Sequence, residues 1–128
     1  MYRYNATVER VVDGDTIDLM IDLGFDVWTH QRIRLSDIDT PERNTPLGKA
    51  LKKHMANLLE GKKIIIDVTK PDKYGRYLGT LWMTEGSIES INDQLYSNNL
   101  AKLYAGGSKT SLWAADELSV ATVGVVFK

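Results

Sequence analysis

The sequence predicts an α+β fold in which a small five-stranded Greek-key β-barrel carries about three helices on its outside. Three observations predict it: five short segments of β type, helical periodicity that interrupts and follows them, and no strand–helix–strand repetition. The 128 residues suffice for one domain, and there is no internal repeat, low-complexity segment or linker. We therefore expect residues 1–128 to form a single domain.

The first three strands are predicted as a meander. Residues 4–12 are rich in Val, Thr and Tyr, and Asp13-Gly14 marks a turn after them. From Thr16 onward polar and apolar residues alternate, and the apolar face contains Ile17, Leu19, Ile21 and Leu23. After a turn at 24–26, a third strand is predicted over 27–35.

A helix is predicted from Thr45 as N-cap and Pro46 at its first position to Gly61, which ends it. Its apolar residues recur at helical spacing: Leu47, Ala50, Leu51, Met55, Leu58 and Leu59. A fourth strand follows over 62–68, then a polar loop over 69–74.

The fifth strand is predicted over 75–83. A second helix should start near Ser90 and end at Asn99, because Asn is second only to Gly at the left-handed position after a helix. A third, shorter helix is predicted over 111–120. This order of elements indicates a barrel of the OB type with the helices packed outside.

Composition excludes several kinds of site. The chain has no cysteine and two histidines, His30 and His54, so disulfides, zinc-thiolate sites and thiol catalysis are excluded and a histidine-rich metal site is not expected. No run is apolar and long enough to span a bilayer, and the N-terminus lacks the pattern of a signal peptide. We therefore expect no membrane segment and a cytoplasmic protein, unless a leader has been removed.

The charge balance is nearly neutral. A net charge of −1 and a pI near 6.1 disfavour a strong, non-specific nucleic-acid binder. They do not disfavour a phosphodiester-cleaving site, whose cations can be local and whose metal supplies further positive charge.

Three short motifs contain the groups that such a site needs. Asp13-Gly14-Asp15-Thr16 by itself predicts no more than a hairpin turn. The segment 32–42 joins Arg34 at the end of a strand to Asp39-Thr40-Pro41-Glu42 in a loop that proline stiffens. Asp72-Lys73-Tyr74-Gly75-Arg76 precedes the fifth strand. Planar guanidinium groups can each bind two phosphoryl oxygens, and carboxylates bind hard cations.

With these three motifs in this order, the chain resembles the staphylococcal nuclease (thermonuclease) family from about Tyr4 to Tyr104. Each motif alone is weak evidence for this resemblance, whereas the three motifs in this order are specific evidence. The resemblance implies a Ca²⁺ site with Asp15 and Asp39 as carboxylate ligands and the Thr40 carbonyl as a third ligand. It places Asp13 near the metal, linked through water.

The resemblance also implies catalytic and substrate-binding roles. Glu42 corresponds to the general base that activates or orients the attacking water, and Arg34 and Arg76 to the two phosphate-binding arginines. Lys73 and Tyr74 correspond to contacts with a terminal phosphate, or else form a solvated turn. Tyr104 corresponds to a tyrosine that stacks on a base, or else packs inside.

Other residues receive structural interpretations, and two departures from the family stand out. We expect His54 on a helix flank, Trp28, Trp82 and Trp113 in core or edge packing, and Lys52, Lys53, Lys62 and Lys63 in solvent. The loop 43–46 is short, which affects how Glu42 is held. Phe127 stands where the family often ends with an apolar residue and tryptophan.

The leading functional hypothesis is a Ca²⁺-dependent nuclease acting on DNA and RNA, with single strands preferred and 3′-phosphate products. We also expect it to be a monomer. The alternatives are a catalytically weak or inactive module that binds nucleic acid or protein, and a calcium-dependent structural protein. The presence of Asp15, Arg34, Asp39, Glu42 and Arg76 together favours the enzyme.

Overall fold

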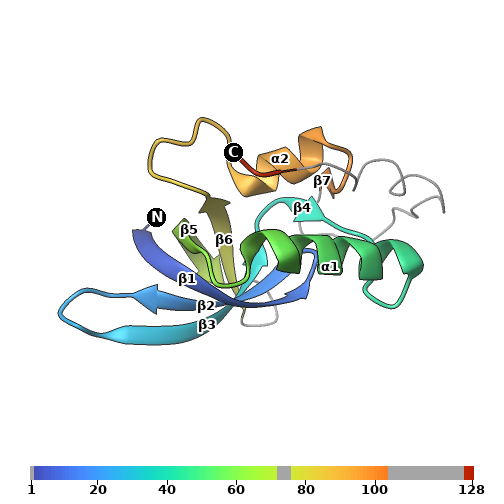
Figure 1. The fold of residues 1–128 in the computed structure, drawn as a ribbon. Coiled ribbons are helices and arrows are strands. Elements are labelled where there is room, and N and C mark those ends of the chain that lie inside the picture. Colours follow the sequence, from blue (N-terminus) through green and yellow to red (C-terminus); the bar gives the residue numbers. More distant parts are fainter. Residues whose placement is uncertain (1, 72–75, 104–125) are drawn as a thin grey trace.

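In the part of the chain that the structure describes, five strands close a barrel in the order β1-β2-β3-β6-β5, and two helices lie beside it (Figure 1). The structure is a computed structural model that describes residues 2–71, 76–103 and 126–128. The barrel strands are β1 (Tyr2–Asp13), β2 (Thr16–Asp22), β3 (Trp28–Leu35), β5 (Lys63–Pro71) and β6 (Tyr77–Trp82). The predicted α+β barrel is confirmed.

The meander and the barrel closure use different pairings. In the meander, β2 pairs antiparallel with both β1 and β3. β5 pairs antiparallel with both β1 and β6. The remaining contact is parallel: residues 33–35 of β3 lie beside residues 77–79 of β6. At Gly79 a Cβ atom would lie 2.7 Å from a methyl carbon of Ile33, so glycine permits this close approach.

Alternation along the strands fills the barrel interior. Its fully buried side chains include Ile17, Leu19, Ile33, Ile66 and Leu81. Burying each of these aliphatic side chains stabilises the fold by roughly 1.5–3 kcal/mol. The interior is therefore made by the apolar face that strand alternation predicts.

Helix α1 (Pro46–Leu59) covers the barrel with the apolar face predicted for it. The Thr45 side chain accepts a hydrogen bond from the Gly48 N–H at 3.1 Å, and Gly61 follows the helix with φ of 81°. Leu51, Met55 and Leu59 are buried in the core. Both predicted ends are confirmed.

Helix α2 (Ile91–Ser97) begins after Ser90, whose side chain accepts from the Asp93 N–H at 3.0 Å. Asn99 has φ of 61°, so it occupies the left-handed position expected for it. Phe127 is 5% exposed and packs in the core, as its position predicts. The third predicted helix, 111–120, and Trp113 lie outside the described residues.

A second, two-stranded sheet was not predicted. β4 (Ile38–Asp39) pairs antiparallel with β7 (Lys102–Leu103), which follows α2. Strands of two residues are too short to show alternation, so the sequence gives no signal for them.

The structure corrects several details. β5 continues to Pro71 through a register shift after Val68, and β6 begins at Tyr77 rather than 75. Leu23, predicted on the buried face, is 45% exposed, and Trp28 is 50% exposed rather than packed. Leu23 directly follows β2 and Trp28 is the first residue of β3, so both belong to the end of the β2–β3 hairpin, which extends away from the helices in Figure 1.

The other structural interpretations hold. Trp82 packs at the edge of the barrel, where its indole N–H donates to Asp67. His54 is half-buried on α1, and the four lysines named above are exposed. No helix among residues 2–71, 76–103 and 126–128 is both long and apolar enough to cross a membrane.

Candidate active site

The turn between β1 and β2 is packed closely against the loop after β3. The Asp13 carboxylate accepts from the Gly14 N–H at 2.9 Å, and the Asp15 carbonyl accepts from the Leu35 N–H at 2.8 Å. A Cβ atom on Gly14 would lie 2.8 Å from the Thr40 hydroxyl oxygen. Glycine therefore allows the turn to bring Asp15 next to Thr40.

Arg34 connects two buried carboxylates. Its Nη2 lies 3.5 Å from Asp15 Oδ2 and 3.7 Å from Asp39 Oδ1. Its Nη1 donates to the Leu35 carbonyl oxygen at 2.7 Å, which fixes the guanidinium plane. Asp15, Arg34 and Asp39 are each less than 9% exposed. These charges interact in a poorly hydrated environment and are therefore strongly coupled.

Hydroxyl and amide groups complete the surroundings of Asp15. The Thr16 hydroxyl donates to Asp15 Oδ1 at 3.2 Å, and the Thr40 N–H donates to Asp15 Oδ2 at 3.4 Å. Thr40 is 1% exposed, and its own hydroxyl oxygen has no hydrogen-bond partner among the residues that the structure describes. A buried polar atom of this kind is uncommon in folded proteins and suggests a missing ligand.

The donor set fits a hard divalent cation. Two carboxylates facing one guanidinium carry a net charge of −1, and a divalent ion would reverse it to +1. Within the described parts of the chain, no three acidic or histidine side chains gather at one point. The protein therefore offers Asp15, Asp39 and the Thr40 backbone, and water or phosphate oxygens must supply the other ligands, as Ca²⁺ readily accepts.

The short loop after Thr40 is tied to the start of α1. Glu42 is exposed, and its carbonyl oxygen accepts from the Thr45 N–H at 3.0 Å and from the Thr45 hydroxyl at 2.6 Å. A Cβ atom on Gly48 would overlap this carbonyl oxygen. The backbone of Glu42 is therefore held in place even though the loop is short.

Arg76 lies next to β6, the strand that pairs with the end of β3 in which Arg34 stands. It is half-buried and directly precedes β6, in which Leu78 is the partner of Arg34. Arg76 is therefore two residues along and one strand across from Arg34. This offset corresponds to a separation between their Cα atoms on the order of 8 Å. Lys73, Tyr74 and Tyr104, the three predicted substrate contacts, lie outside the described residues.

One supporting residue was missed. Asn92, for which no role was predicted from the sequence, is 3% exposed and joins three segments. Its amide nitrogen donates to the carbonyl oxygens of Ser36 and Gly79 at 3.2 and 3.0 Å, and its oxygen accepts from the Leu81 N–H at 3.0 Å. It lies on the apolar face of α2, and a polar residue on such a face could have revealed this role.

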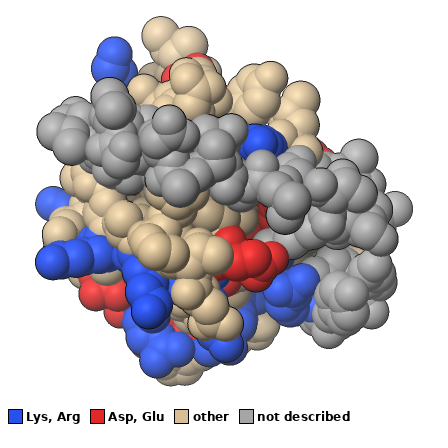
Figure 2. Space-filling model, turned by 90° about the vertical axis from the view of Figure 1, so that its right-hand side faces the viewer, with Lys and Arg blue, Asp and Glu red and all other residues tan. Residues whose placement is uncertain are grey.

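Surface charge around the barrel is mixed. In Figure 2, acidic side chains lie between basic ones on the described part of the face that is turned toward the viewer. On the outer face of the meander Asp18 accepts from Arg32 at 2.8 Å, and this hydrogen bond lowers the pKa of Asp18. A continuous positive surface is not seen on these described residues, in keeping with the near-neutral sequence.

Comparison with known proteins identifies the family. A model described as "Staphylococcal nuclease homologue" matches residues 32–122, which include Arg34, Asp39, Glu42 and Arg76. The chain belongs to the staphylococcal nuclease homologue family. The match begins after Asp15, so that ligand candidate rests on the resemblance and on the geometry above.

Several curated proteins are similar to this chain over part of their length. Protein ParB of Escherichia coli is 37% identical over 99 residues, 77% of this chain and 52% of that protein. An uncharacterized endonuclease of Escherichia coli O157:H7 is 38% identical over 64% of this chain and 50% of its own length. A micrococcal nuclease of Shigella flexneri is 32% identical, with 62% and 42% covered. The chain thus spans about half the length of these relatives.

Proposed function

We propose that this chain is a Ca²⁺-dependent nuclease that hydrolyses phosphodiester bonds of DNA and RNA. The observation that carries the proposal is the buried group of Asp15, Arg34 and Asp39, in which one guanidinium nitrogen lies 3.5 and 3.7 Å from two carboxylates. Such a group fits a divalent cation and an anionic substrate together. Nuclease-named relatives of the same family support the reaction class.

Asp15 and Asp39 hold the cation in this proposal, with the Thr40 carbonyl as a third ligand and Asp13 linked through water. When bound, Ca²⁺ supplies positive charge beside the phosphoryl oxygens and polarises phosphorus. Ca²⁺ suits the site because it accepts irregular oxygen coordination, whereas Mg²⁺ requires nearly ideal octahedral geometry.

Arg34 and Arg76 bind the phosphoryl oxygens. Negative charge builds on these oxygens as water attacks phosphorus, and each guanidinium can donate two parallel hydrogen bonds to them. The hydrogen bond from Arg34 Nη1 to the Leu35 carbonyl oxygen orients the Arg34 guanidinium before substrate arrives. Preorganised donors of this type stabilise a transition state without a reorganisation cost.

Glu42 orients or deprotonates the attacking water. Its exposed carboxylate stands on a backbone that Thr45 and Gly48 fix, so the group is positioned while it remains open to solvent. The 5′-oxygen leaves, and the products carry 3′-phosphates. Lys73 and Tyr74 contact a terminal phosphate and Tyr104 stacks on a base, which favours single strands with accessible bases.

The test is cleavage of single-stranded DNA and RNA with Ca²⁺ or with a chelator. Cleavage should require Ca²⁺ and return when it is restored. Glu42→Gln should lower kcat on the order of a hundredfold or more with the fold intact. Glu89→Gln, a change at another exposed glutamate, is the control and should leave kcat unchanged. Binding without cleavage under every condition would refute the nuclease and support the binding module.

A further inference from the structure

The tip of the β2–β3 hairpin holds an aromatic residue in an unfavourable backbone conformation. The Val27 N–H donates to the Gly24 carbonyl oxygen at 2.9 Å across a tight turn. The two central residues, Phe25 and Asp26, have φ of 55° and 62°. Turns with two positive φ angles favour Asn and Gly, and a bulky side chain there is strained. Strain retained at such a position suggests a function.

The same residue is also fully exposed to water. Phe25 has a relative exposure of 102%, and Leu23, Val27 and Trp28 beside it are about half-exposed. Single exposed apolar residues are ordinary, but a cluster of four at one tip indicates an interaction surface. We call these four residues the hairpin tip.

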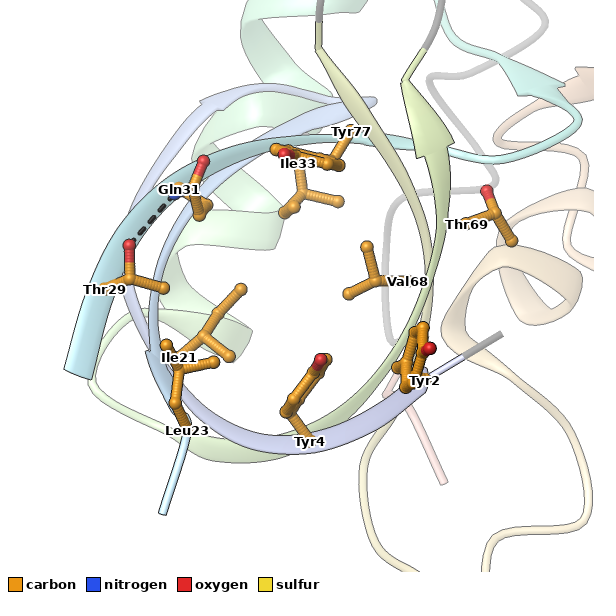
Figure 3. A pocket seen from close by; sticks show the side chains of 10 residues that line it. All are labelled: Tyr2, Tyr4, Ile21, Leu23, Thr29, Gln31, Ile33, Val68, Thr69 and Tyr77. Atoms are coloured by element: carbon orange, nitrogen blue, oxygen red, sulfur yellow. Dashed lines mark hydrogen bonds between the residues drawn. The ribbon is translucent and has the colours of Figure 1, made fainter. Parts of the chain in front are cut away.

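The barrel is open at the end from which this hairpin projects. Figure 3 shows side chains from β1, β2, β3, β5 and β6 around one opening, which has a volume of about 470 Å³. None of the lining residues that the structure describes is charged. Six of them supply most of the apolar wall: Tyr2, Tyr4, Ile21, Ile33, Val68 and Tyr77. We call this opening the barrel mouth, and it is large enough for a phenyl ring.

We propose that the hairpin tip and the barrel mouth form a self-association surface, with Phe25 of one copy entering the mouth of a second copy. Leu23 belongs to the tip and also lines the mouth, so the two features lie at the same end of the barrel. A twofold axis can then place each tip in the other mouth, and the dimer closes instead of extending into a fibre. A monomer was predicted from the sequence, and the experiment below decides between the two.

The area and the charge at this end favour a second copy over other partners. The tip residues with Tyr2 and Tyr77, which are 72% and 40% exposed, present on the order of 800 Å², the area that a typical stable interface needs from each partner. Asp22 and Asp26 flank the tip, and their carboxylates repel nucleic-acid phosphates and anionic lipids. The described residues that line the mouth of a second copy carry no charge, so they do not repel these carboxylates.

The experiment measures self-association of the full chain by sedimentation equilibrium. Wild type should dimerise. Phe25→Ser removes the ring and Val68→Trp fills the mouth, and each should weaken the dimer by about a hundredfold or more. Ile88→Ser is the control, because Ile88 is 99% exposed on another part of the surface, and it should associate as wild type does.

Mixing the two variants distinguishes a blocked mouth from a damaged fold. Val68→Trp retains Phe25, and Phe25→Ser retains an open mouth, so the mixture should form a heterodimer tighter than either homodimer. A wild-type monomer at all concentrations, or a Phe25→Ser dimer as tight as wild type, would overturn the proposal. Loss of oligonucleotide binding by Phe25→Ser with unchanged association would instead assign the tip to nucleic acid.

Discussion

Two arginines on β3 should differ sharply in their effect on stability, and the difference tests the electrostatics of the candidate site. Arg34 and Arg32 lie two residues apart on one face of the strand. The Arg32 pair with Asp18 is the shorter, at 2.8 Å, whereas Arg34 lies 3.5 and 3.7 Å from its two carboxylates. Distance alone ranks Arg32 as the stronger partner.

Burial reverses this ranking. The Arg32 side chain is 51% exposed, and that of Arg34 is 10% exposed. At an effective dielectric constant of 20, each contact of Arg34 contributes about 4 kcal/mol of attraction, part of which offsets desolvation. Arg34→Met leaves Asp15 and Asp39 buried together without their cation, and should lower the free energy of unfolding by about 3–5 kcal/mol. Arg32→Met should change it far less, because the Asp18 side chain is 26% exposed to water and still has Arg10 at 3.9 Å.

Urea unfolding measures both variants, first in chelator and then in Ca²⁺. A divalent ion replaces the positive charge that Arg34→Met removes, so Ca²⁺ should restore much of the lost stability. At a concentration a hundred times Kd, the gain is about 2.7 kcal/mol. Cleavage should not return, because the phosphate-binding guanidinium is still missing. Equal losses for the two variants in chelator, or a deficit in Arg34→Met that Ca²⁺ leaves unchanged, would refute this reasoning.

Three further predictions address the surroundings of the site. Gly14→Ala should cost about 1–3 kcal/mol through overpacking against Thr40 and Leu51 and weaken Ca²⁺ binding in calorimetry, whereas Gly86→Ala, with nothing nearby, should do neither. Asn92→Ala should lower the free energy of unfolding by roughly 3 kcal/mol, since it abolishes three buried hydrogen bonds; a loss below 1 kcal/mol would contradict its role. Hydrogen bonds from Arg3 hold the pKa of Asp67 below its unfolded value of 3.8, so that ion pair stabilises the fold above that value and loses its effect as pH falls through the lower folded pKa. The stability difference between wild type and Asp67→Asn should therefore shrink on acidification below about pH 4 in urea titrations, and a constant difference would exclude this linkage.

Local sequence signals were sufficient for most of the fold. Thr45, Pro46 and Gly61 mark the ends of α1 because capping depends on the residues at the ends themselves. Alternation after Thr16 identifies β2 because one of its faces is buried. Leu23 was misassigned since alternation describes a strand but cannot show where the neighbouring strands stop covering it.

Only part of the candidate site could be predicted from the sequence, for a related reason. The motifs identify Asp15, Arg34 and Asp39, but nothing in them gives the distances between segments that are far apart in sequence. Those distances depend on the antiparallel contact of β2 with β3, in which Thr16 is the partner of Arg34, and on the close approach at Gly14. Asn92 escaped notice because its three partners are backbone groups of other segments, and backbone groups leave no pattern in a sequence.

The small sheet of β4 and β7 affects the order in which the protein can be assembled during synthesis. Asp39 in β4 pairs with Lys102 in β7, so the strand carrying a proposed metal ligand lacks its partner until the chain beyond α2 is available. Chains fold from the N-terminus as they leave the ribosome, and pairings between distant residues form late. The meander can form early, whereas the complete site must wait for residue 102 to leave the exit tunnel. A growing chain therefore acquires the geometry of the proposed site only after most of its barrel is in place.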